Sequence, residues 1–150
     1  IINLLNYLQT KYKTTKVVVS NQAGVARKYF DCRRVTEINE YIDRLLKRKG
    51  ININNWQYCP YVDKEYAELK KGKIDFDLNF VKDKTKRKPK KDMVDDALKI
   101  LNRKRSEFEE IIVIGDRKED KELANNINGI YIDANSKYEE IIRTIKKEVN

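Results

Sequence analysis

The segment that follows the apolar run of residues 111–114 carries the clearest chemistry in this sequence. The run ends in Gly115 and Asp116, and a second carboxylate, Asp120, follows four residues later. An apolar, β-branched run predicts a buried strand, and in α/β sheets ligands collect outside the carboxyl ends of the strands. Mg²⁺ prefers oxygen ligands and commonly takes only one or two protein carboxylates. Asp116 and Asp120 are therefore candidate Mg²⁺ ligands, although Gly-Asp is also an ordinary turn at a strand end.

A second β-branched run, residues 16–22, ends in polar groups that can bind phosphate. Its last three residues are Ser20, Asn21 and Gln22. They offer a hydroxyl and two amides to a phosphoryl oxygen. Ser and Asn are also common turn residues, so this segment alone leaves both interpretations open.

A third segment, Arg87-Lys88-Pro89, stands in a basic loop just before a predicted helix. The cations of this basic run are Lys82, Lys84, Lys86, Arg87, Lys88, Lys90 and Lys91. Such a run can be a solvated loop, can attract a small anionic substrate, or can follow a nucleic-acid backbone.

Taken in order, the three segments resemble the second, third and fourth motifs of the haloacid dehalogenase superfamily of phosphotransferases. Residues 20–27 read Ser-Asn-Gln-Ala-Gly-Val-Ala-Arg. This is similar to the Thr-Asn-Gln-Ser-Gly-Ile-Ala-Arg of the branch that contains histidinol-phosphate phosphatase and heptose bisphosphate phosphatase. The Cys-Pro at residues 59–60 and the Arg-Lys-Pro at 87–89 extend the likeness, which covers residues 4–133.

The resemblance implies a role for each candidate side chain. Ser20 would hydrogen-bond the transferring phosphoryl group, and Lys88 would neutralise its charge and that of the attacking carboxylate. The implied substrate contacts are Asn21, Arg27 and Arg87. At the implied metal site Asp116 would bind Mg²⁺, and Asp120 would support it directly or through water. These roles agree with the chemistry of the residues, because phosphoryl transfer depends mainly on positioning and on stabilisation of negative charge.

One family motif has no counterpart in this chain. In the family, the nucleophile is the first Asp of an Asp-x-Asp-Gly-Thr segment that ends the first strand, and the second Asp is the general acid/base. Asp75 and Asp77 come too late in the order to serve. Without an in-line carboxylate no aspartyl phosphate can form. Because that strand is central in the family's sheet, its loss would leave unpaired backbone groups, and we expect a segment upstream of Ile1 in the intact protein.

The zinc loop of many heptose bisphosphate phosphatases is also unmatched. There Cys-Pro-His and a later Cys-x-Cys hold the metal, whereas this chain has Cys-Pro-Tyr at 59–61 and Lys-Thr-Lys at 84–86. Lysine cannot replace a thiolate and the chain has no histidine, so a four-ligand zinc site is excluded at this loop. The remaining cysteine, Cys32, adds no disulfide pattern, which favours a reducing cytoplasmic setting.

Length and hydrophobic spacing predict one α/β domain over residues 1–150, lacking its first strand. No apolar stretch reaches membrane-spanning length. The expected helices lie around residues 4–8, 38–46, 93–101, 123–127 and 138–145, and the expected strands at 16–22, 56–59, 111–115 and 129–132. Residues 63–86 look inserted, with a short helix at 65–71 and a strand or hairpin at 76–80. Alternating strands and helices predict a three-layer, Rossmann-like parallel sheet with crossover helices.

These observations leave three functions open. The first is an Mg²⁺-dependent phosphomonoesterase domain that acts on a small phosphorylated sugar or amino alcohol through an aspartyl phosphate, with its nucleophile outside this chain. The second is a polynucleotide 3′-phosphatase-like domain, because such enzymes share Thr-Asn-Gln and Arg-Lys-Pro segments and the net charge of +9 suits DNA. The third is a non-catalytic phosphate-binding or regulatory domain. Since Lys88 already has a role in the basic run, a small substrate is favoured over nucleic acid, and no membrane partner is expected.

Overall fold

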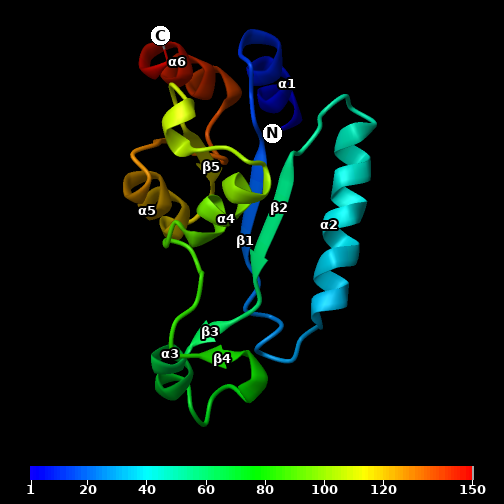
Figure 1. The fold of residues 1–150 in the computed structure, drawn as a ribbon, viewed down its shortest axis with the longest axis vertical. Coiled ribbons are helices and arrows are strands. Elements are labelled where there is room, and N and C mark those ends of the chain that lie inside the picture. Colours follow the sequence, from blue (N-terminus) through cyan, green and yellow to red (C-terminus); the bar gives the residue numbers. More distant parts are fainter. Residues whose placement is uncertain (150) are drawn as a thin grey trace.

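The structure is a computed structural model that describes residues 1–149 of the 150-residue chain. Its elements follow in the order α1 Ile2–Lys11, β1 Val17–Asn21, α2 Cys32–Lys47, β2 Asn55–Cys59, β3 Val62–Asp63, α3 Lys64–Leu69, η1 Leu78–Phe80, β4 Val81–Lys82, α4 Asp92–Ile100, η2 Arg105–Glu107, β5 Ile112–Gly115, α5 Lys118–Asn126, β6 Ile130–Asp133 and α6 Tyr138–Glu148. The two η elements are short 3-10 helices. Strands and helices alternate along most of the chain, which confirms the α/β class (Figure 1).

The strands form three parallel pairs. β1 pairs with β2, β3 with β4, and β5 with β6. Ser20 lies opposite Tyr58 in the first pair, and Gly115 lies opposite Asp133 in the third. Within residues 1–149 no strand hydrogen-bonds to both β1 and β5. The two main pairs are therefore separate sheets, and the small β3–β4 pair lies beyond the carboxyl end of β2 (Figure 1).

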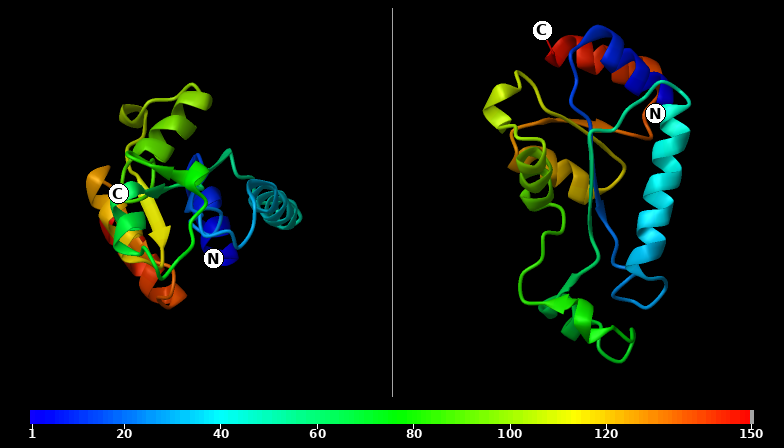
Figure 2. Two further views of the ribbon diagram at one scale, coloured as in Figure 1. Left: turned by 90° about the horizontal axis from the view of Figure 1, so that it is seen from below. Right: turned by 45° about the vertical axis from the view of Figure 1, so that its right-hand side comes forward.

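Alternate side chains of β5 enter two different cores, which creates the layers. Ile112 and Ile114 pack against the first core, whereas Val113 packs against the second. The buried residues of the first core, contributed by α1, β6 and α6, are Leu4, Leu8, Ile132, Ile141 and Ile145. Those of the second core, from α4, α5 and the turn after α5, are Val94, Leu98, Leu123 and Ile127. Because side chains alternate across a strand, helices cover both faces of the β5–β6 pair (Figure 2).

Helices α4 and α2 flank the β1–β2 pair. α4 contacts both β1 and β2 while its apolar face enters the second core, so it spans the two main strand pairs. α2 runs alongside β2 (Figure 1). It is attached there by a hydrogen bond of 3.2 Å from Trp56 Nε1 to Asp43 Oδ1. Helix α4 thus links the β1–β2 pair to the β5–β6 pair.

The inserted segment differs in part from expectation. Its helix, α3, is present, but the strand or hairpin predicted at residues 76–80 is wrong. The Asp77 side chain accepts a hydrogen bond of 3.0 Å from the Asn79 main-chain N–H, and the Phe80 N–H bonds to the Asp77 carbonyl at 2.9 Å. An aspartate side chain that accepts a hydrogen bond from the main-chain N–H two residues later favours a turn over an extended strand. Phe76 still packs into a small local core, while Leu78 is 81% exposed.

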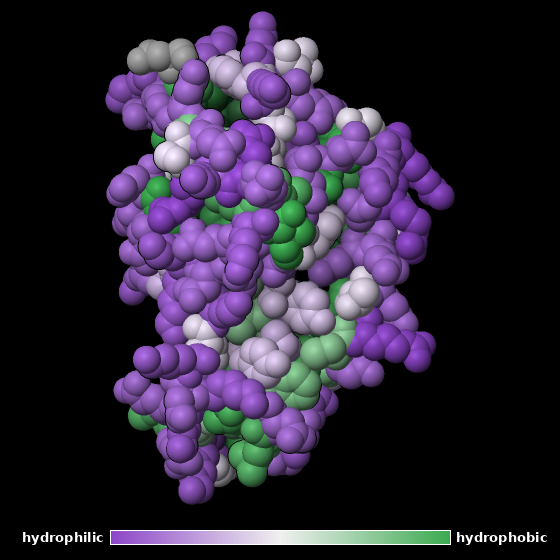
Figure 3. Space-filling model, viewed as in Figure 1, coloured by the Kyte–Doolittle hydropathy of each residue, from purple (hydrophilic) through white to green (hydrophobic). Residues whose placement is uncertain are grey.

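Hydrophilic side chains cover most of the face shown in Figure 3. This agrees with a composition in which 38% of residues are charged. None of the helices in the described part of the chain combines the length and apolar character needed to cross a bilayer.

Candidate functional site

The carboxyl end of β1 presents Ser20 and Asn21. The Gln22 side chain donates a hydrogen bond of 2.8 Å to Ser20 Oγ, and the Gln22 main-chain N–H bonds to the Cys59 carbonyl at 2.8 Å. The second bond continues the β1–β2 ladder for one residue and fixes the chain as it leaves the strand. Ser20 Oγ accepts the hydrogen bond from Gln22, so its own proton remains available to donate to a ligand.

Asn21 connects β1 to the basic loop. The Lys88 N–H donates to Asn21 Oδ1 at 2.8 Å, and Asn21 Nδ2 donates to the Lys88 carbonyl at 3.1 Å. The following peptide bond, between Lys88 and Pro89, is cis. Lys88 is therefore fixed through its main chain to the end of β1, although 67 residues separate it from Asn21 in the sequence.

The Lys88 side chain reaches the second strand pair. Its Nζ lies 2.5 Å from Asp120 Oδ1, and the two side chains are 15% and 7% exposed. Asp120 Oδ2 also accepts a hydrogen bond of 3.2 Å from the Arg117 N–H, in the first turn of α5. This arrangement explains Gly115, because a Cβ there would lie 2.3 Å from Asp120 Cγ. Ser20, Asn21, Lys88 and Asp120 thus lie around the adjoining carboxyl ends of β1 and β5.

Asp116 is the first residue after β5 and is exposed. Asp116 lies near Asp120 and Asp133, because the negative charges of all three carboxylates affect the same Tyr131 hydroxyl. Desolvation raises the pKa of Tyr131, and the charges of Asp133, Asp120 and Asp116 raise this pKa further. The Tyr131 hydroxyl donates a hydrogen bond of 3.1 Å to the Gly115 carbonyl.

The donor chemistry of Asp116 and Asp120 fits Mg²⁺. No cluster of three or more His, Cys, Asp or Glu side chains suited to a metal occurs among residues 1–149. Two carboxylates are nevertheless sufficient for Mg²⁺, which usually keeps several waters and takes remaining ligands from a substrate phosphate. One of the two, Asp116, is exposed, while the other is held by Lys88 and the Arg117 main chain.

The two candidate arginines bind tyrosines in the inserted segment or next to it. Arg87 Nη1 donates to the Tyr61 carbonyl at 3.2 Å, and Arg27 Nη2 donates to the Tyr66 hydroxyl at 2.7 Å. Arg27 Nε is buried and has no hydrogen-bond partner among the described residues. Arg27 therefore fastens the insertion to the residues that follow β1, and Arg87 joins the two chain segments that flank the insertion.

Three of the seven cations of the basic run, Lys86, Lys88 and Lys90, pair with carboxylates from elsewhere in the fold. Lys86 pairs with Asp96 on α4, and Lys90 Nζ lies 3.5 Å from Asp63 Oδ1. Lys82 Nζ stands 5.6 Å from the centre of the Tyr61 ring. The run is thus not a continuous strip of unpaired cations of the kind that follows a nucleic-acid backbone.

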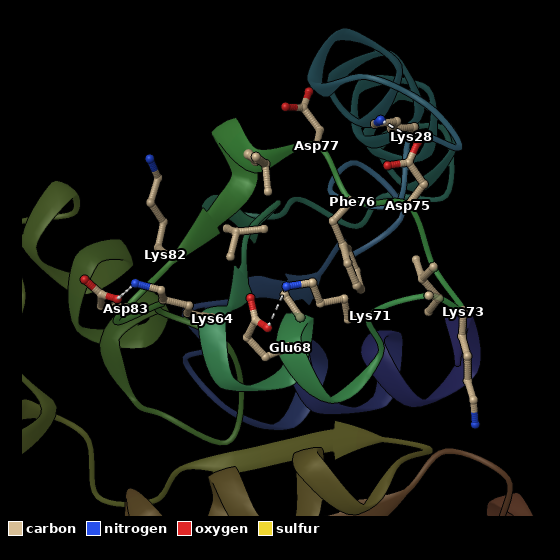
Figure 4. A pocket seen from close by; sticks show the side chains of 15 residues that line it. Lys28, Lys64, Glu68, Lys71, Lys73, Asp75, Phe76, Asp77, Lys82 and Asp83 are labelled. Atoms are coloured by element: carbon tan, nitrogen blue, oxygen red, sulfur yellow. Dashed lines mark hydrogen bonds and ion pairs between the residues drawn. The ribbon is translucent and has the colours of Figure 1, made fainter.

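An open hollow of about 1180 Å³ lies in the insertion, away from Ser20, Lys88 and Asp120. Ion pairs join several of its lining residues, including Lys64 with Asp83, Lys71 with Glu68, and Lys28 with Asp75 (Figure 4). Since its charges are largely matched internally, the hollow offers no concentrated charge to a phosphate.

Two residues that contact the site lie outside the sequence motifs. Asn126, at the end of α5, donates a hydrogen bond of 2.8 Å from Nδ2 to the Pro89 carbonyl. The hydroxyl of Tyr131, on β6, donates a hydrogen bond to the Gly115 carbonyl. Neither belongs to a local pattern, because each contact depends on the fold bringing distant segments together.

Comparisons with known proteins show that this chain is similar to phosphatases. Residues 85–130 match the family model described as HAD-hydrolase-like. The D-glycero-beta-D-manno-heptose-1,7-bisphosphate 7-phosphatase of Neisseria meningitidis serogroup A is 28% identical over 115 residues, covering 77% of this chain and 51% of the relative. The enzyme of the same name from Haemophilus influenzae is 31% identical over 104 residues, covering 69% of this chain and 49% of the relative. The chain therefore spans about half the length of the curated relatives it matches.

A solved structure shares the fold. It is the D,D-heptose 1,7-bisphosphate phosphatase from B. bronchiseptica complexed with magnesium and phosphate, which superposes with a TM-score of 0.59 at 21% sequence identity. The match covers 86% of this chain and 60% of that one. With the family model and the relatives, this likeness confirms the resemblance carried by the three sequence motifs. The chain is thus similar to phosphatases of the haloacid dehalogenase superfamily.

Proposed function

We propose that this chain forms the phosphate-binding part of an Mg²⁺-dependent phosphomonoesterase domain that acts on a small phosphorylated sugar or amino alcohol. The observation that carries the proposal is the junction of Lys88 with Asn21 and Asp120, which sets an ammonium group beside the ends of β1 and β5. The names of the matched relatives support a sugar bisphosphate as the substrate class.

In this proposal the residues of the chain bind and orient the phosphoryl group. The Ser20 hydroxyl would donate to a phosphoryl oxygen, and the Lys88 ammonium would neutralise the negative charge. Asp116 and Asp120 would hold Mg²⁺, which when bound supplies further positive charge to the phosphoryl oxygens. Such fixed charges act strongly because phosphoryl transfer depends mostly on positioning and electrostatic stabilisation.

Transfer through an aspartyl phosphate also needs a carboxylate in line with the phosphorus. No Asp or Glu precedes Ser20 in residues 1–150, so the nucleophile of the proposed reaction lies outside these residues. The same observation favours a second function, a non-catalytic phosphate-binding domain. Hydrolysis of a heptose bisphosphate by the intact protein separates the two, because only the first function predicts turnover.

Isothermal titration calorimetry with inorganic phosphate and MgCl₂ tests the shared binding site. Lys88→Ala is expected to weaken phosphate binding by about 10- to 100-fold, the range for a charge-assisted hydrogen bond. Lys91→Ala, which removes a neighbouring exposed lysine, is the matched control and is expected to leave phosphate affinity unchanged. Asp116→Ala is expected to abolish Mg²⁺ binding.

Two results contradict the assignments. Equal Mg²⁺ affinity in the wild type and Asp116→Ala shows that Asp116 is not a ligand. Turnover of p-nitrophenyl phosphate by residues 1–150, lost in Asp116→Ala, shows that the nucleophile lies within this chain.

A further inference from the structure

The Lys88–Pro89 main chain is held from two sides by asparagine side chains. On one side, Asn21 bonds both the N–H and the carbonyl of Lys88, at 2.8 and 3.1 Å. On the other side, Asn126 donates to the Pro89 carbonyl at 2.8 Å. Both asparagines are distant in sequence from the loop, by 67 and 37 residues. Three hydrogen bonds therefore fix two consecutive residues, two from β1 and one from α5, the helix that packs on the β5–β6 pair.

The chemistry of the Asn21 amide matches this task. A carboxamide offers a donor and an acceptor in one plane, so it can satisfy the N–H and the carbonyl of a single residue together. The orientation of the amide is fixed by its partners, because the Lys88 N–H requires the oxygen and the Lys88 carbonyl requires the NH₂ group. An aspartate at position 21 would offer only acceptors, so its carboxylate would repel the Lys88 carbonyl oxygen.

Helix α5 contacts the loop at both of its ends. Asp120 in its first turn pairs with Lys88 Nζ, while Asn126 in its last turn bonds the Pro89 carbonyl. The step of six residues from Asp120 to Asn126 spans about 9 Å of helix axis. Because a helix is stiff, α5 fixes the distance between the anchor of the ammonium and the anchor of the main chain.

We propose that Asn21 and Asn126 are positioning residues, which hold the Lys88–Pro89 main chain so that the Lys88 ammonium occupies one place beside Ser20 and Asp120. This proposal rests on the proposed function in assigning the ammonium to phosphate. Lysine has a flexible four-carbon stem with many rotamers, so its ammonium group is held in one place only when the main chain is fixed as well as the ammonium itself. For Asn21, this role replaces the substrate contact implied by family resemblance, since its observed bonds go to Lys88.

The first test follows the Lys88 ammonium by NMR in the absence of any ligand. Proton exchange between water and the Lys88 Nζ group is expected to be slow in the wild type and about two- to tenfold faster in Asn21→Ala and in Asn126→Ala, the change that follows loss of a net hydrogen bond. Asn125→Ala is the matched control, because Asn125 is the exposed neighbour on α5 and its side chain makes no hydrogen bond among the described residues. Unchanged exchange in both Asn21→Ala and Asn126→Ala overturns the proposal.

The second test is a double-mutant cycle on the affinity for inorganic phosphate. Asn126→Ala is expected to weaken phosphate binding about two- to tenfold in the wild type and to have no effect in the Lys88→Ala background. Equal losses in both backgrounds indicate a general structural role and overturn the proposal. Asn126 is exposed, so Asn126→Ala is expected to fold. At position 21, Asn21→Asp serves as a second variant beside Asn21→Ala.

The two tests separate this proposal from the proposed function. If the wild type binds no phosphate but Lys88 exchange still quickens in the asparagine variants, the proposed function fails and the positioning role stands. If phosphate binding depends on Lys88 but is indifferent to Asn21 and Asn126, the positioning role fails and the proposed function stands.

Discussion

The Lys88 ammonium lies 2.5 Å from Asp120 Oδ1 and joins the loop bound to β1 to the first turn of α5. Both side chains are largely withdrawn from solvent, at 15% and 7% exposure. An ion pair in such a setting gains little over an apolar pair of the same shape, but removing one partner leaves an uncompensated charge. The pair therefore makes the site sensitive to single substitutions on either side.

Asp120→Ala is expected to lower the free energy of unfolding by about 3 kcal/mol, because it strands the Lys88 charge. Asp116→Ala removes a carboxylate of the same type from an exposed position and is expected to change stability by less than about 0.5 kcal/mol. Urea denaturation followed by the fluorescence of Trp56, the single tryptophan, measures both. Equal losses in the two variants contradict the structural importance of the ion pair.

Gly115→Ala is expected to destabilise the protein by about 1–3 kcal/mol, the usual cost of overpacking. Gly115 does not have a positive φ, so the cost comes from the approach of its new Cβ to Asp120 Cγ, at 2.3 Å. Gly24→Ala provides the comparison, because the atoms that its Cβ meets lie at the far end of the Phe30 ring, which can swing aside. Denaturation midpoints are expected to fall more for position 115 than for position 24, and the reverse order contradicts the explanation of the Gly-Asp motif.

The sequence predicted what depends on local patterns and strand direction. The β-branched runs identified β1 and β5, and the rule that ligands collect at the carboxyl ends of strands directed attention to Asp116 and Asp120. The role of Lys88 came from the family resemblance, and the structure places its ammonium group beside Asp120. The prediction failed at residues 76–80, where the side chain of Asp77 captures the Asn79 N–H and overrides the alternating pattern.

Contacts that depend on tertiary distance could not be predicted. Asn21 was recognisable only as a polar residue at a strand end. Its two hydrogen bonds to the Lys88 main chain depend on how the basic loop returns to the end of β1. Asn126 and Tyr131 carry no motif, and only the packing of α5 and β6 brings them to the site. Arg27 and Arg87 matched the family motif, yet their guanidinium groups bind Tyr66 in the insertion and Tyr61 just before it.

The attachment of α2 is expected to weaken in acid. Hydrogen bonds from Lys47 and Trp56 lower the pKa of Asp43 despite its partial desolvation. A lowered pKa means that the unfolded state takes up the proton first, so the stabilisation is present above the ordinary value of about 3.9 and is lost as pH falls through the lowered pKa. Asp43→Asn keeps an acceptor for Trp56 Nε1 without a titrating group.

The measurement compares the unfolding free energies of the wild type and Asp43→Asn between pH 6 and pH 2.5. The difference between the two proteins is expected to be constant above about pH 4 and to shrink below it. Other carboxylates titrate in both proteins and cancel in the difference. A difference that stays constant to pH 2.5 contradicts the assigned role of Asp43.

Salt dependence of binding is expected to distinguish a small phosphorylated substrate from nucleic acid. Each phosphate neutralised on duplex DNA adds about 0.9 to the slope of log affinity against log salt. Carboxylates pair with Lys86, Lys88 and Lys90, so within the described structure the other cations of the basic run do not form a continuous strip for a polyanion. We therefore expect a small phosphorylated ligand to bind with a shallow slope, with Lys88→Ala far more damaging than Lys82→Ala or Lys91→Ala. Oligonucleotide binding with a slope of several units, weakened alike by each lysine substitution, contradicts this ranking and favours a polynucleotide 3′-phosphatase.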